Sequence, residues 1–130
     1  MDIHDPTSPK IIYHRQFDDV DITDVDFCGS YLFVAMHNLK KKQDGRVLIF
    51  HTLSTTQPMK IKHDVTVGSH PDMLVSTKNC TTILVAVEGE PFVQNGSIVD
   101  PEGGVGIIRI DSDITYKFLN FRHFNTSGRG

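Results

Sequence analysis

Four carboxylates gather around one stretch of this 130-residue sequence. Glu88 and Glu90 follow one apolar run, and Asp100 and Glu102 precede the next. If the two runs are paired strands, all four side chains lie at one end of a sheet, where they offer oxygen ligands of the kind that calcium prefers. A second interpretation is that they cap turns and accept backbone N–H bonds, and a third is a catalytic acid/base pair. The spacing of the four carboxylates matches no closed metal motif, so they are candidates for a calcium site and no more than that. We expect no catalytic residue and no cofactor other than calcium.

Asparagine sequons are the second feature with chemical meaning. Asn79, Asn95 and Asn125 each begin an Asn-x-Ser/Thr sequence, and all three fall in expected turns or loops. Such sequons are glycan acceptors in exported proteins, although some arise by chance. They predict an extracellular glycoprotein.

The histidines do not cluster at metal-ligand spacing. His63 and His70, with Asp64 and Asp72, come nearest to a group. Asp72 stands in the second half of the chain where Asp24 stands in the first, and this repetition favours a structural role in a turn over metal binding.

Two cysteines occupy similar places in the two halves, just before an apolar run. If Cys28 and Cys80 lie on neighbouring packed sheets, they are about 10 Å apart. That distance exceeds the usual Cα separation in a disulfide. We therefore expect the two cysteines to be unpaired or paired separately.

Composition excludes some classes of function. The net charge is −3 and the sequence pI is about 6.1, which argues against a nucleic-acid partner. No apolar run approaches the ~20 residues of a membrane-spanning helix. Met1–Lys10 also lacks the apolar core of a signal peptide.

Short β-strands should account for most of the chain, because β-branched and aromatic runs alternate with Gly, Pro, Asn and Asp. Two runs, Tyr31–Met36 and Thr82–Val87, are apolar at nearly every position, which is typical of strands buried on both faces. The predicted strands are Ile11–Phe17, Ile22–Phe27, Tyr31–Met36, Arg46–His51, Lys60–Val67, Met73–Thr77, Thr82–Val87, Val105–Ile110 and Ile114–Phe121.

The order of these strands repeats. Ser8–Phe50 can be aligned with Gln57–Ile110 at an offset that grows from about 49 to about 59 residues, in the range of propeller blades with loop insertions. The sequence predicts an all-β, partial β-propeller of two four-stranded antiparallel blades, at approximately 10–56 and 57–124, plus a spare strand. Since propellers close with about four to eight blades, we expect residues 1–130 to be a fragment of a larger propeller whose remaining blades are its partners.

The motifs within this repeat resemble those of a known family. Pro71-Asp72-Met73, Glu88-Gly89-Glu90-Pro91 and Asp100-Pro101-Glu102-Gly103 occur in the order found in the choice-of-anchor I family. This family includes the mesenchyme-specific cell-surface glycoproteins of animals. The resemblance covers most of the chain, although Val87 stands where the family usually has Asn, which puts any polar site at that position in doubt.

The resemblance implies an exported, glycosylated β-propeller, associated in animals with cell surfaces and with biomineralised skeletons or shells. The expected function is a non-catalytic extracellular module for binding or scaffolding, whose partner is a protein, a glycan or a mineral surface. Related bacterial domains occur beside phosphatase or nucleotidase domains. The alternative is therefore a propeller that is accessory to such an enzyme domain outside this chain. A further alternative is an intracellular propeller that makes protein–protein contacts.

Overall fold

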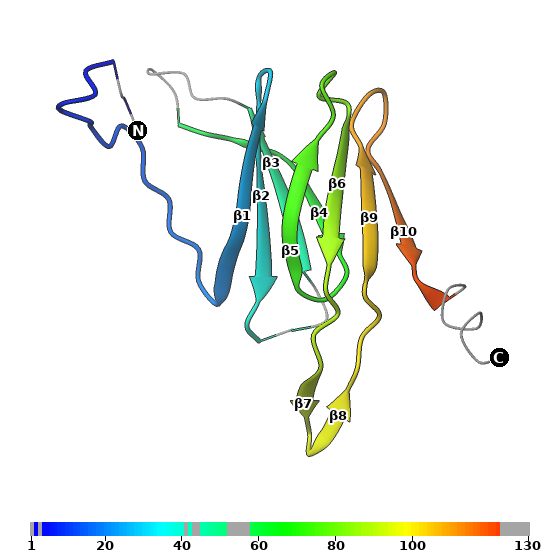
Figure 1. The fold of residues 1–130 in the computed structure, drawn as a ribbon. Helices are drawn as coiled ribbons and strands as arrows, with labels where there is room; N and C mark the ends of the chain where they lie inside the picture. The colour runs from blue at the N-terminus through cyan, green and yellow to red at the C-terminus, as the bar shows by residue number, and fades with distance from the viewer. Residues whose placement is uncertain (1, 3, 41, 43–44, 52–57, 123–130) are drawn as a thin grey trace.

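Two four-stranded antiparallel sheets stand side by side in the structure, a computed structural model that describes residues 2, 4–40, 42, 45–51 and 58–122 (Figure 1). A separate two-stranded hairpin projects beyond one end of the second sheet. The strands are β1 (Val20–Cys28), β2 (Tyr31–Asn38), β3 (Gly45–His51), β4 (Ile61–Val67), β5 (Pro71–Ser76), β6 (Thr82–Val87), β7 (Phe92–Gln94), β8 (Ser97–Val99), β9 (Gly104–Arg109) and β10 (Thr115–Asn120).

The strand order of each sheet is that of a propeller blade. The first sheet has the order β1-β2-β3-β4, and the second has the order β5-β6-β9-β10, with every neighbour antiparallel. The two sheets are called blade one and blade two below. They confirm the predicted all-β, blade-like architecture, and in the described part of the chain they do not close a ring.

The core lies between the blades because the central strands carry apolar side chains on both faces. From blade one, Phe33, Ala35, Val47 and Ile49 are fully buried against blade two. The same cluster contains these buried side chains from blade two: Leu74, Ile83, Val85, Val87 and Ile108. A second cluster, formed by Val34, Met36, Leu48 and Phe50, lies on the opposite face of blade one. The continuous apolar run of β2 is therefore explained by burial on both faces, whereas β6 is buried mainly on the face toward blade one, and Leu84 on its other face is 38% exposed.

One predicted strand is wrong. Residues 11–17 form no strand, although Asp2 and Lys10 make an isolated bridge just before them. A strand needs a neighbour for its ladder, and no described strand pairs with this segment. Its end packs instead on the outer face of blade one, where Phe17 contacts the second cluster and the Arg15 guanidinium lies over the Phe17 and Phe50 rings.

A disulfide joins the end of β1 in blade one to the β5–β6 turn of blade two, which corrects the expectation for the cysteines. Cys28 and Cys80 are bonded, with their Cα atoms 5.5 Å apart. The spacing of about 10 Å applies to the faces of packed sheets. The blades converge at their inner edges, where β1 lies beside β5, so the separation there falls within the usual range for a disulfide.

Carboxylates also tie β1 to β5. The Oδ2 atom of Asp24 accepts a hydrogen bond from the Leu74 N–H at 2.8 Å. The Oδ2 atom of Asp26 accepts from the Ser76 N–H at 2.8 Å and from the Ser76 hydroxyl at 2.6 Å. The Ser76 hydroxyl bond is the largest cause that holds the pKa of Asp26 below its usual value. These bonds take the place of a backbone ladder between the two inner strands.

The register shows how the two blades correspond. Asp24 pairs with Ala35 in blade one, and Met73 pairs with Ala86 in blade two, each directly after a bulge. Asp24 is therefore equivalent to Met73, one position away from the Asp72 that the sequence comparison suggested. The acidic side chains of β1 thus have no counterpart at the equivalent positions of β5.

Candidate functional site at the acidic end of blade two

The candidate site lies where β6, β9 and β10 meet at one end of blade two. Val87 pairs with Gly104, and Gly104 pairs with Asn120, so the two limbs of the 88–103 loop leave the sheet next to each other. Gly89 has a φ of +67°, and a Cβ there would lie 2.6 Å from the backbone of Glu102 and Gly103. Only glycine allows this close approach of the limbs.

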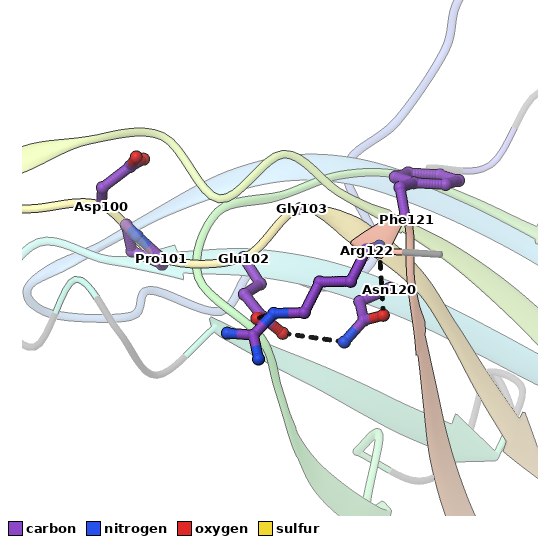
Figure 2. Close-up of a pocket in the computed structure, with 7 residues that line it drawn as sticks. All are labelled: Asp100, Pro101, Glu102, Gly103, Asn120, Phe121 and Arg122. Atoms are coloured by element: carbon purple, nitrogen blue, oxygen red, sulfur yellow. Dashed lines mark hydrogen bonds and ion pairs between the residues drawn. The ribbon is translucent and has the colours of Figure 1, made fainter. Parts of the chain in front are cut away.

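A pocket of about 390 Å³ opens at this end of the blade (Figure 2). Its volume is within the range of small-molecule sites. It is lined by Asp100, Pro101, Glu102, Gly103, Asn120, Phe121 and Arg122.

Most of the polar groups in this pocket bind one another. The Asn120 Nδ2 donates to the Glu102 Oε2 at 3.0 Å, and Arg122 forms an ion pair with the Glu102 Oε1. No ion pair joins Asp100 to another residue in the described part of the chain, and Phe121 is half exposed. Asp100 and Phe121 are therefore the groups that this pocket leaves for a ligand.

The four calcium candidates do not share one centre. Glu88 and Glu90 face His70, with the Glu90 Oε2 2.8 Å from the His70 Nδ1, whereas Glu102 pairs with Arg122. Among the described residues, no group of three or more His, Cys, Asp or Glu is arranged to hold a metal ion. A calcium site at this loop stays a prediction, and the partners of these carboxylates favour the alternative that they stabilise the loop.

A β-hairpin within the 88–103 loop was missed in the sequence. Phe92 pairs with Val99, Val93 with Ile98 and Gln94 with Ser97, which leaves Asn95 and Gly96 as the turn. Both turn residues have positive φ, 51° and 78°, as a type I′ turn requires. Asn-Gly is the strongest short signal for such a turn, so the sequence contained the information. Val93 and Ile98 are 72% and 78% exposed on the hairpin.

The structure places two of the three sequons. Asn95 is exposed at the tip of the projecting hairpin, and a Cβ on the adjacent Gly96 would meet no atom within 4 Å. Asn79 is exposed in the β5–β6 turn, but its Oδ1 accepts a 2.6 Å hydrogen bond from the Thr77 hydroxyl, and its neighbour Cys80 is in the disulfide. Asn125 lies outside the described residues. The surroundings of Asn95 are thus the more open of the two.

The residues weighed as a histidine group do not form one. His63 lies on β4, where it pairs with Ile49, while His70 precedes β5 and stacks on His37 of blade one. Asp64 forms an ion pair with Arg46, and Asp72 is exposed on β5. His37 was not among the residues predicted from the sequence to form a site.

The described residues contain no helix that is long and apolar enough to span a membrane. No curated protein and no solved structure matches the chain in sequence or structure searches. One family model does match, that of the choice-of-anchor I domain, over residues 1–130. Because this match covers the whole sequence, the chain belongs to the choice-of-anchor I family.

Proposed function

We propose that this chain is a non-catalytic binding or scaffolding module of a glycoprotein at the cell surface or outside the cell. Its family is one of non-catalytic domains associated with the cell surface. The observation that carries the proposal is the Cys28–Cys80 disulfide, which joins both blades. Disulfides of this structural kind form and persist in oxidising, extracytoplasmic environments.

Glycosylation of the hairpin tip is the second part of the proposal. Asn95 is exposed, lies on a projecting turn and has open space beside it. A glycan on its side-chain nitrogen would stand next to the exposed Val93 and Ile98 and shield them from water. We propose Asn95 as the principal acceptor, with Asn79 secondary because its side chain is already hydrogen-bonded in its turn.

The acidic end of blade two is the surface that we propose for partner binding. Glu88, Glu90 and Asp100 bring negative charge to one end of the molecule, and the Asn95 hairpin projects from the same end. A surface of this kind would suit a calcium mineral or a basic protein partner, because both present positive charge. The pocket beside Phe121 offers a place for a small glycan group.

Expression of the full-length protein in cells that export it tests the location. Surface biotinylation of intact cells should label the protein, thiol alkylation without reductant should leave Cys28 and Cys80 unmodified, and glycosidase treatment should shift its mobility. Asn95→Gln should remove most of the shift, while Asn79→Gln should remove less. Two alkylated cysteines in a protein that is inaccessible on intact cells would contradict the proposal.

Adsorption to calcium carbonate crystals tests the mineral partner. A Glu88→Gln/Asp100→Asn variant, which removes two negative charges, should bind less than the parent protein. The matched control is Asp111→Asn/Asp113→Asn, because these residues lie in the β9–β10 turn at the other end of blade two. Equal loss in both variants would show an effect of net charge alone, and no loss in either would exclude this surface.

A further inference from the structure

Two histidines from different blades stack face to face near the root of the 88–103 loop. The rings of His37 and His70 have centroids 4.5 Å apart and an interplanar angle of 22°. His37 ends the buried part of β2 and is only 8% exposed. Its Nδ1 is buried and has no hydrogen-bond partner among the described residues. This part of the contact between the blades is thus made by a titratable ring.

One member of this pair, His70, also contacts the base of the acidic loop. The Nδ1 of His70 lies 2.8 Å from the Glu90 Oε2, within ion-pair distance although it is not aligned as a hydrogen bond. Its Nε2 lies 4.0 Å from the Glu88 Oε2. The backbone makes two further links, from the Glu88 N–H to the His70 carbonyl at 3.0 Å and from the Gly89 N–H to the Ser69 carbonyl at 3.1 Å.

Charged or titratable groups from both blades lie near His37. Asp21 of β1 pairs with His37 in the register, Lys42 follows β2, and His70 and Glu90 come from blade two. Burial is the main cause that lowers the pKa of His37, and the charges of His70 and Lys42 lower it further, against the smaller opposite effects of Asp21 and Glu90. The neutral form of His37 is therefore the one that fits this contact.

We propose that the stacked His37–His70 pair is an acid-sensitive contact that holds the root of the 88–103 loop against blade one near neutral pH and releases it in acid. When the His37 ring is protonated, a positive charge is placed in a nearly buried position against the face of the His70 ring, at a centroid distance of 4.5 Å. The carboxylates of Glu88 and Glu90 lie beside His70, and of these two only Glu90 opposes the lowering of the His37 pKa, by a smaller effect than burial. The blades then separate locally, and the hairpin that carries Asn95 gains freedom.

The direction of the pH effect follows from linkage. A group whose pKa is lower in the folded chain contributes stability that is present above its unfolded pKa, about 6.5 for histidine. That stability is lost as the pH falls through the folded pKa. The loop root should therefore be protected at pH 7.5 and should open as the solution is acidified below about pH 6.5. This inference does not depend on the proposed location of the protein.

Hydrogen exchange of the Leu74 amide, which donates to Asp24 of blade one, and of the Glu88 and Gly89 amides, corrected for the intrinsic effect of pH, tests the proposal. The protection of these amides should fall between pH 7.5 and pH 5. The expected loss is up to tenfold for each pH unit that separates the lower pKa of His37 in the folded protein from its pKa in the unfolded chain. His37→Phe keeps a ring in the stack and should abolish most of the pH dependence. His63→Phe is the matched control, because burial also lowers the pKa of His63, which lies on β4.

A second variant keeps the proposal testable if His37→Phe does not fold. His70→Asn places a residue that tolerates positive φ at a position where φ is 54°. In this variant the pKa of His37, measured from its ring resonances by NMR, should rise toward the ordinary value. An unchanged pKa of His37, or an acid-induced loss of amide protection that persists in His37→Phe, would overturn the proposal.

Discussion

Loss of the Cys28–Cys80 disulfide should cost this protein a large share of its stability. The bond joins residues that are 52 positions apart. With a loop of this length, the chain-entropy relation gives about 4 kcal/mol of stabilisation through restriction of the unfolded chain. Total unfolding free energies are only about 5–15 kcal/mol, so the reduced protein should be close to marginal.

Urea unfolding followed by circular dichroism measures this effect. With an m value of about 1.5 kcal/mol/M, reduction should lower the midpoint by roughly 2–3 M. Reduced and oxidised protein have the same side chains, so their comparison isolates the cross-link from packing. The Cys28→Ala/Cys80→Ala variant is the control, since reductant should not shift its midpoint. A shift below about 0.5 M on reduction of the parent protein would refute the reasoning.

Three further perturbations test the contacts between the blades and the outer face of blade two. Asp26→Asn should lower the free energy of unfolding by about 1.5–3 kcal/mol, because it weakens the bonds to Ser76. In the parent protein, the stability that the Asp26 carboxylate contributes is present above about pH 3.9 and is lost as the pH falls through the lowered pKa of Asp26. Acid unfolding of the parent and the variant should therefore differ in this pH range. Gly45→Ala should cost about 1–3 kcal/mol in urea unfolding, because a Cβ there would lie 2.3 Å from a proline ring, whereas Gly96→Ala at the hairpin tip should leave the midpoint nearly unchanged. Val75 is 49% exposed on the outer face of blade two and should promote self-association. In sedimentation velocity, Val75→Lys should therefore associate less than the parent protein, and equal association of the two proteins would contradict this.

The fold was predictable because its signals are local and repeated. The runs Tyr31–Met36 and Thr82–Val87 are apolar at nearly every position, which indicates central strands of packed sheets, although only the first run is buried on both faces. The segment 11–17 also contains β-branched and aromatic residues, but it lies outside both sheets. Composition gives the preference for an extended chain, while the presence of a neighbour decides whether a strand forms.

The pairings between the blades were not predictable from the sequence. The bond between Cys28 and Cys80 depends on the convergence of β1 and β5, and a mean spacing of sheets does not describe an inner edge. The stack of His37 on His70 likewise joins residues that are far apart in the chain. The acidic residues were found by composition, but their division between His70 and Arg122 follows from the path of the loop.

The side chains of Asp24 and Asp26 have a consequence for how this protein avoids unwanted assembly. The inner edge of β5 would otherwise present free N–H groups, and such an edge is a template on which a foreign strand can add. The two carboxylates accept hydrogen bonds from the N–H groups of Leu74 and Ser76. A side-chain carboxylate has no backbone N–H to offer in turn, so it cannot extend the hydrogen-bond ladder to a further strand. β1 therefore closes the edge of β5 without merging the two blades into one continuous sheet, which keeps them separate units and blocks the addition of a strand at this edge.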